Sequence, residues 1–164
     1  MTTTSVSEAQ AWSVLNRVAD PEIPVLSITD LGIVRWIKRD ADELVVGLAP
    51  TYTGCPATEV IAANVLTALR RSGYDAVRVE TVLSPPWTTD WISDEGREKL
   101  HRYGIVPPAS GQSKKSLLGG SRDIACPRCD CTSTTRVSEY GSTPCKAAYK
   151  CDSCLEPFEY FKCI

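Results

Sequence analysis

Hydrophobic and polar residues in the first hundred positions follow two different periods. Apolar residues recur at helical spacing after Ser7 and Gln10, which form a capping-box pair, whereas later stretches alternate β-prone and polar residues. Pro21 and Pro24 end the first helical pattern because proline cannot continue a helical ladder, and Gly73 ends the second. The predicted elements are helix 7–19, strand 33–39, strand 43–49, helix 56–72, strand 76–83 and helix 93–103.

This order of elements, α-β-β-α-β-α, predicts an α+β fold, a small mixed sheet with helices on one face. The turn 40–42 joins the first two strands into a hairpin. The helix 56–72 then crosses over to the third strand, and such a connection is expected to be right-handed.

The hydrophobic pattern changes after residue 106. The stretch 107–122 is rich in proline, glycine, serine and lysine and has no hydrophobic period, which predicts a linker. Short β-prone runs beyond it predict a small all-β module of three strands, over 132–140, 147–150 and 158–162. We therefore expect a domain at 1–106, the linker, and a second domain at 123–164.

The composition indicates a globular protein and argues against nucleic-acid and membrane partners. With 43% apolar and 23% charged residues the chain can bury a core, and its net charge of −2 gives no positive field for nucleic acid. We expect neither a nucleic-acid nor a membrane partner, because no window approaches the roughly 18–20 apolar residues of a membrane helix. The first residues carry no export signal, which favours a cytoplasmic protein.

The cysteines are concentrated at one end of the chain. Seven of the eight lie in the last 39 residues, and a dense cluster in a reducing compartment favours a metal over disulfides. Two Cys-x-x-Cys pairs, separated by 21 residues, have the spacing of a zinc ribbon. The predicted metal ligands are Cys126, Cys129, Cys151 and Cys154. The expected cofactor is structural Zn²⁺, which would also stabilise so small a module.

Three further cysteines of this segment leave alternatives open. Cys131, Cys145 or Cys163 could replace one of the four ligands, or together with them hold an iron–sulfur cluster, since both metals accept four thiolates. A segment without metal, its extra cysteines paired as disulfides, is the remaining interpretation.

Cys55 stands apart, in the loop 51–56 between a predicted strand and a helix. The positive end of a helix dipole and free backbone N–H groups stabilise a thiolate there, as in a reactive or metal-binding cysteine. The alternative is a small residue that fills a gap under the helix. Thr51 and Thr53 add hydroxyl groups to the same loop.

Three acidic residues lie in turns that an α+β fold could bring to the Cys55 loop. Asp20 and Glu22 occupy the turn bracketed by prolines, and Asp30 occupies the next turn. Aspartate is also a common turn former and cap, so a purely structural role is the alternative for each of these positions.

Three motifs carry a resemblance to a known family: Asp-Pro-Glu-Ile-Pro at 20–24, Asp-Leu-Gly at 30–32 and Thr-x-Thr-Gly-Cys-Pro at 51–56. Residues 7–85 thereby resemble the SufT-like iron–sulfur assembly proteins. The resemblance implies an α+β domain in which Cys55 handles a transient Fe–S cluster, with Asp20, Glu22, Asp30, Thr51 and Thr53 shaping the neighbouring pocket.

The rest of the chain resembles a more specific family. The segments 84–92, 137–147 and 154–163 are similar to the D subunits of the bacterial phenylacetyl-CoA epoxidase system of phenylacetate catabolism. That resemblance implies the oxygenase and reductase components and the Fe–S assembly machinery as partners. Two chains could also pool their Cys55 thiolates as a homodimer.

The same chain lacks the residues for the epoxidation itself. His101 is the one histidine, and there is neither a di-iron motif nor a glycine-rich dinucleotide loop. We therefore expect an accessory or maturation protein, not an enzyme, with a non-catalytic structural subunit as the alternative. Trp87 and Trp91 have two interpretations, as anchors for a partner or as packing residues.

Overall fold

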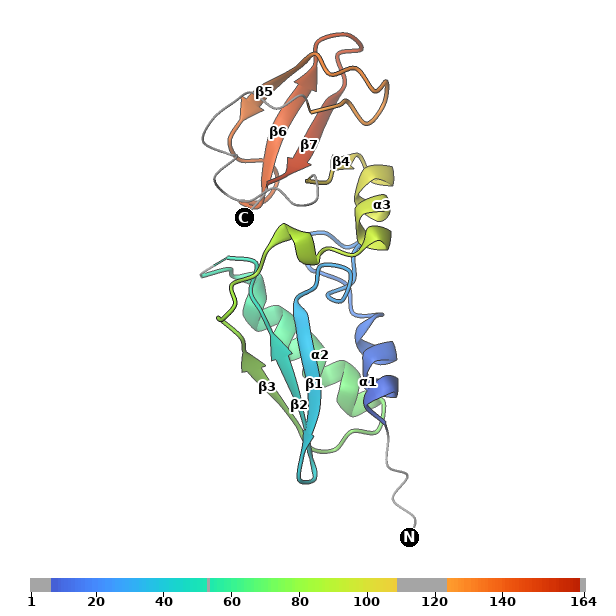
Figure 1. The fold of residues 1–164 in the computed structure, drawn as a ribbon, viewed down its shortest axis with the longest axis vertical. Helices are drawn as coiled ribbons and strands as arrows, with labels where there is room; N and C mark the ends of the chain where they lie inside the picture. Colours follow the sequence, from blue (N-terminus) through green and yellow to red (C-terminus); the bar gives the residue numbers. More distant parts are fainter. Residues whose placement is uncertain (1–6, 53, 109–123, 163–164) are drawn as a thin grey trace. The chain divides into compact units, whose positions relative to one another are not determined.

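The computed structural model describes residues 7–52, 54–108 and 124–162, which divide into two compact units (Figure 1). The first unit comprises residues up to Trp87 together with Trp91–Ser93, and the second comprises Thr88–Asp90 and the residues from Asp94 onward. Within the described residues, none of the helices combines the length and the apolar character needed to cross a lipid bilayer.

The first unit is a three-stranded sheet with two helices on one face, as expected for the α+β class (Figure 1). The sheet order is β1-β2-β3, with β1 antiparallel and β3 parallel to β2. Its elements are α1 (Glu8–Leu15), β1 (Val34–Asp40), β2 (Glu43–Leu48), α2 (Ala57–Arg71) and β3 (Val77–Thr81).

Helix α1 begins as the sequence predicts and ends earlier. The Ser7 hydroxyl accepts from Gln10 N at 3.3 Å, and the Gln10 side chain accepts from Ser7 N at 2.8 Å, which completes the capping box. The predicted end at residue 19 is wrong. Residues 16–19 leave the helix because Val18 O accepts from Ile28 N at 2.9 Å, and Ala19 forms a β-bridge with Ser27.

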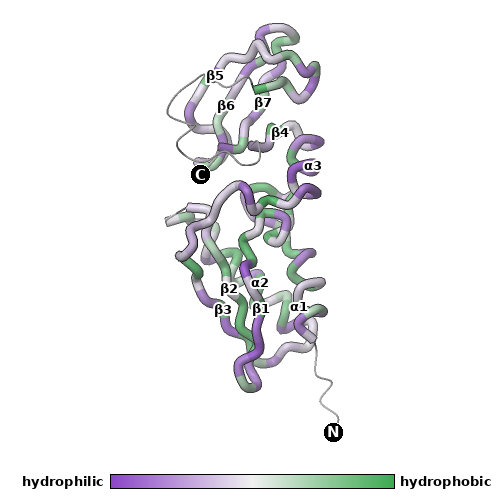
Figure 2. The backbone as a smooth tube through the Cα atoms, viewed as in Figure 1, coloured by the Kyte–Doolittle hydropathy of each residue, from purple (hydrophilic) through white to green (hydrophobic). Residues whose placement is uncertain are grey.

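The core of this unit lies between the helices and one face of the sheet. Helix α2 buries a stripe of residues four apart, and β2 is the most hydrophobic strand (Figure 2). The fully buried side chains include Val65, Leu69, Leu44 and Val46. Each buried aliphatic side chain contributes about 1.5–3 kcal/mol relative to an exposed one.

The opposite face of the sheet is covered by long side chains. The Trp36 ring lies directly over Gly47, its cross-strand partner, and Lys38 Nζ lies 4.3 Å from the ring centroid. Arg78 on β3 forms ion pairs with Asp40, at 3.5 Å, and with acidic neighbours on β2 and β3. Val45, which pairs with Lys38 on one side and with Arg78 on the other, is completely buried.

We expect Gly47→Ala to destabilise the chain by about 1–3 kcal/mol, because a Cβ there would lie 2.3 Å from the Trp36 ring. Urea unfolding of Gly47→Ala, Trp36→Leu and the double variant Gly47→Ala/Trp36→Leu checks this. The second substitution should recover part of the loss, since the clash needs both side chains. Simple additivity of the two effects would contradict the proposed contact.

The second unit extends the predicted ribbon by one strand. Its sheet order is β4-β7-β6-β5, with β4 parallel to β7 and the other neighbours antiparallel. Its elements are η1 (Thr89–Trp91, which crosses the division), α3 (Asp94–Arg102), β4 (Ile105–Val106), β5 (Thr134–Ser138), β6 (Lys146–Cys151) and β7 (Pro157–Phe161). The three predicted strands are present as β5, β6 and β7.

The last predicted helix lies elsewhere than expected. Helix α3 contacts β4, and β4 pairs with β7, so both belong to the second unit. Hydrophobic periodicity shows that a helix forms but not which sheet it joins. The division at 1–106, 107–122 and 123–164 remains a prediction.

A buried ion pair connects β6 and β7. Lys146 Nζ lies 3.0 Å from Glu159 Oε2, and Ser142 donates to the same carboxylate from its backbone N and its hydroxyl. Burial acts to raise the pKa of Glu159, but these hydrogen bonds outweigh it and hold the pKa below its usual range. The Lys146 side chain is only 5% exposed, so removal of its partner would leave a buried charge.

We expect Glu159→Gln to destabilise the second unit. Breaking a fully buried ion pair costs about 3–5 kcal/mol, and the loss here should be smaller because the Glu159 side chain is 27% exposed. Since the folded-state pKa of Glu159 is depressed, this stabilisation is present above the ordinary carboxyl pKa, near 4.3, and is lost as the pH falls through the folded value. When the free energy of unfolding is measured against pH, it should therefore fall less on acidification in Glu159→Gln than in the wild type. Identical slopes would contradict the assignment.

Candidate functional site

The four predicted metal ligands meet in the second unit. The Sγ atoms of Cys126, Cys129, Cys151 and Cys154 all lie within 4.8 Å of one another. Cys126 Sγ is 3.7 Å from Cys154 Sγ, and Cys129 Sγ is 3.6 Å from Cys151 Sγ. A zinc ion with four thiolates at about 2.3 Å requires separations of about 3.8 Å. The sulfur geometry therefore fits a tetrahedral four-thiolate metal site.

The two Cys-x-x-Cys loops have matching backbone geometry. Arg128 N donates to Cys126 Sγ and Cys154 N donates to Cys151 Sγ, each at 3.5 Å. After the second cysteine of each loop the chain turns through a left-handed residue, Asp130 (φ 57°) and Leu155 (φ 64°). Each turn allows one short loop to present two sulfurs.

One edge of the sulfur cluster is buried and the other is exposed. Cys126 and Cys151 have no solvent-exposed surface, whereas Cys129 and Cys154 are exposed. The buried pair belongs to the small core of this unit, with Ile124, Phe158 and Tyr160. The site thus forms part of the core and is reached by solvent from one side.

The thiols differ in acidity. The backbone N–H of Cys154 contributes most to lowering the pKa of Cys151 to about 6, against the effect of burial. The backbone N–H of Cys131 acts to lower the pKa of Cys129, but hydrogen bonds from neighbouring thiols, with burial, raise it to about 12. A divalent cation binds thiolates, so metal binding at neutral pH would release protons, chiefly from the less acidic thiols.

Two of the remaining cysteines make other contacts. Cys131 Sγ lies 3.0 Å from Ser153 Oγ, and Cys145 Sγ lies 3.0 Å from Thr143 Oγ1. Neither joins the group of four sulfurs among the described residues. Cys163 lies outside the described residues, so its place in the alternatives above stays open.

Cys55 directly precedes the amino terminus of α2. Cys55 O accepts from Thr58 N at 3.2 Å, and Cys55 N donates to Tyr52 O at 3.3 Å, so both backbone groups are engaged. The side chain is partly exposed, and the α2 N-cap, Pro56, makes no side-chain capping hydrogen bond. The loop bends at Gly54 (φ +80°), where a Cβ would have no atom within 4 Å.

Thr51, in the same loop, is partly buried, and Thr53 lies outside the described residues. The acidic residues predicted to approach this loop have structural contacts of their own. Asp20 is buried, and its Oδ1 accepts from Glu22 N at 2.9 Å and from Ile23 N at 2.7 Å. Within the described part of the chain, Cys55 and these carboxylates are not among the groups of three or more ligands close enough to share one ion. Their joint role with Cys55 stays a prediction.

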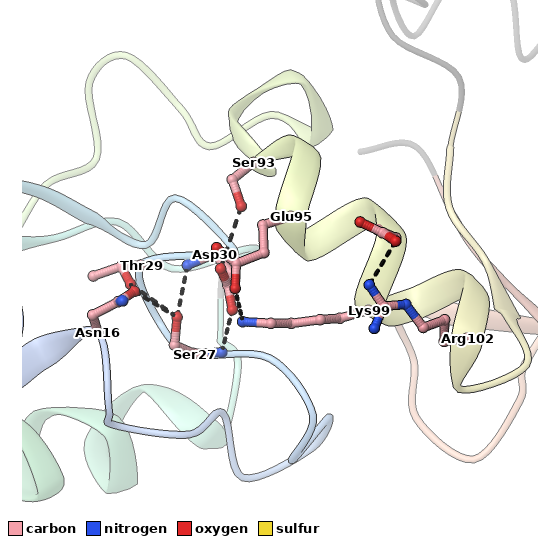
Figure 3. Close-up of polar contacts among 9 residues, drawn as sticks. Asn16, Ser27, Thr29, Asp30, Ser93, Glu95, Lys99 and Arg102 are labelled. Atoms are coloured by element: carbon pink, nitrogen blue, oxygen red, sulfur yellow. Dashed lines mark hydrogen bonds and ion pairs between the residues drawn. The ribbon is translucent and has the colours of Figure 1, made fainter.

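Asp30 is the centre of a polar network (Figure 3). Its Oδ2 accepts from Ser27 N at 2.9 Å while Asp30 N donates to Ser27 Oγ at 3.0 Å, and Ser93 Oγ donates to Oδ1 at 3.3 Å. Thr29 Oγ1 donates to Asn16 Oδ1 at 2.6 Å beside it. Asp30 therefore fixes the turn at 27–30 and attaches residue 93 to it.

The comparisons with known proteins agree with both halves of this description. Residues 8–82, which include Cys55, match the family described as iron–sulfur cluster assembly protein, and residues 110–162 match the PaaD zinc beta ribbon domain. An Escherichia coli K12 protein that carries a provisional name as the D subunit of 1,2-phenylacetyl-CoA epoxidase is 50% identical over 155 residues, 94% of this chain and 92% of that protein. The chain belongs to this family of epoxidase D subunits.

Two solved structures resemble the first unit of this family member. One is a domain of unknown function, DUF59, from Bacillus anthracis, 27% identical with a TM-score of 0.53, covering 57% of this chain and 90% of that one. The other is a conserved hypothetical protein from Thermotoga maritima, 30% identical with a TM-score of 0.51, covering 61% and 98%. Both support the α+β fold.

The sequence reasoning missed several residues that shape the first unit. Ser27 and Asn16 complete the Asp30 network, and the Ser-x-x-Asp spacing at 27–30 was a usable signal, since it has the form of a capping box. Trp87 is buried and donates to Leu31 O at 2.8 Å, and the Arg35 guanidinium lies 3.3 Å from the Trp91 ring centroid. Trp87 is thus buried as a packing residue would be, whereas Trp91 is only partly buried and its role stays a prediction.

We expect the full chain to bind one zinc ion and to lose structure only in its second unit when a strong chelator removes it. The core of that unit is small, so metal binding should provide much of its folding free energy. Hydrogen exchange should show lost protection in β5–β7 and retained protection in β1–β3. Cys126→Ser should reproduce the chelated state, and unchanged protection of β5–β7 after chelation would exclude this role.

Proposed function

We propose that this chain is a non-catalytic maturation protein of the phenylacetyl-CoA epoxidase system, which transfers an iron–sulfur cluster, or iron, through Cys55. The observation that carries the proposal is the place of Cys55, partly exposed and immediately before α2, inside the segment that matches the iron–sulfur assembly family. The Escherichia coli relative's name supports the choice of the epoxidase system.

The local chemistry suits a thiolate that binds its cargo transiently. Helix α2 has 15 residues and no side-chain cap, so the positive end of its dipole would favour an anionic ligand at Cys55. An iron–sulfur cluster takes four cysteine ligands. Because Cys55 provides a single thiolate, the other ligands would come from the client, from the assembly machinery or from a second copy of this chain.

The second unit would have a different task. We propose that Cys126, Cys129, Cys151 and Cys154 hold structural Zn²⁺, a redox-inactive ion that would leave no open coordination position. The residues fit such an ion in number, spacing and sulfur geometry. The ribbon would present a fixed surface to the oxygenase or reductase component in the cytoplasm, while the cargo passes through the first unit.

The test compares Cys55→Ser with Cys145→Ser in cells that depend on phenylacetate. Cys55→Ser should fold normally yet yield epoxidase components poor in iron and sulfide, with activity reduced at least about tenfold, because the transfer ligand is lost. Cys145→Ser, the matched control at a cysteine of the second unit outside the four-sulfur group, should retain activity. Full iron content and activity with Cys55→Ser would overturn the proposal.

The name of the relative as a subunit favours one second candidate, a permanent structural subunit of the epoxidase. The two roles differ in what happens after maturation. If the chain is a maturation protein, a mature complex from which it has been removed should keep its activity. If the chain is a structural subunit, activity should fall on removal and return when the metal-loaded chain, including Cys55→Ser, is added back.

A further inference from the structure

Cys131 is a fifth, partly buried thiol that packs against the core containing Cys126 and Cys151, and its sulfur accepts a backbone hydrogen bond as the sulfur of Cys126 does. Ser133 N donates to Cys131 Sγ at 3.4 Å, two residues on, as Arg128 N donates to Cys126 Sγ at 3.5 Å. The backbone therefore orients the Cys131 sulfur in the same way as it orients the sulfur of a predicted ligand.

The Cys131 side chain already reaches the opposite loop. Its Sγ lies 3.0 Å from the hydroxyl of Ser153, which stands between Cys151 and Cys154. The side chain also packs against the core cluster that contains Cys126 and Cys151. The sulfur is thus held between the two loops that bind the metal.

Cys129 is the ligand that Cys131 is best placed to replace. Cys129 is exposed, whereas Cys126 and Cys151 are completely buried. Cys131 N–H is hydrogen-bonded to Cys129 sulfur, and only Asp130, in the left-handed conformation, separates the two residues. After the exchange, each loop would still provide two sulfurs.

We propose that Cys131 is an alternative ligand of the ribbon metal, which exchanges with Cys129 at the exposed edge. The exchange is redox-neutral. Cys131 loses its proton to solvent as its sulfur–metal bond forms, and Cys129 gains a proton as its own bond breaks, so the number of bound thiolates stays at four. The ribbon would keep its metal when Cys129 is modified or displaced.

The first test counts thiolates with Co²⁺ in the full chain. Sulfur-to-cobalt charge-transfer absorbance should indicate four thiolates in the wild type and in Cys129→Ser, and three in Cys129→Ser/Cys131→Ser. Loss of an outer-sphere partner alone costs about 10–100-fold in metal affinity, so the double variant should bind Zn²⁺ at least about tenfold more weakly than Cys129→Ser.

Cys154→Ser is the matched control, because rescue there would require three sulfurs from one loop. It should show three thiolates whether or not Cys131 is present. Three thiolates in Cys129→Ser, with the same Zn²⁺ affinity as the double variant, would overturn the proposal.

A second measurement avoids ligand variants that fold poorly. In the zinc-loaded wild type, iodoacetamide should label Cys129 as well as Cys131, and mass spectrometry should show that Cys129 is labelled several-fold more slowly in Cys131→Ser. An unchanged labelling rate would contradict the exchange. The inference rests on the proposed metal binding, and a wild-type chain without zinc would reveal that failure before any variant is compared.

Discussion

Four sulfurs held within 4.8 Å of one another are the constraint on which the second unit depends. Two of them are completely buried and form part of a core that otherwise contains only a few apolar side chains. Neighbouring thiols of the cluster share protons in hydrogen bonds, at 3.7 Å between Cys126 and Cys154 and at 3.6 Å between Cys129 and Cys151. A metal ion would replace those protons, so ligand binding and core formation become one event.

The first unit is stabilised in a different way, by the packing of apolar side chains. Its sheet packs against helices on one face, and on the other face Trp36 and the stems of Lys38 and Arg78 take the place of a second layer. Asp20 and Asp30 are hydrogen-bonded to the backbone of the loops that precede β1. These aspartates therefore contribute order to the first unit, and the thiol of Cys55 remains its distinctive chemical group.

These two kinds of stability suit two different tasks in the two units. In the proposed function, the first unit would handle a transient ligand at an exposed helix terminus, where binding and release need little rearrangement. The second would hold a permanent ion whose ligands belong to its core, although the fifth thiol allows exchange at the exposed edge.

Local features could be predicted from the sequence: the capping box of α1, the hairpin of β1 and β2, the stripe of α2 and the two Cys-x-x-Cys pairs. Each of them depends on residues close together in the chain. Tertiary structure decided the rest. Pairing of Val18 with Ile28 ended α1 early, and pairing of β4 with β7 drew α3 into the second unit. Such contacts join distant residues through backbone groups that carry no side-chain signature, so the periodicity of the sequence cannot reveal them.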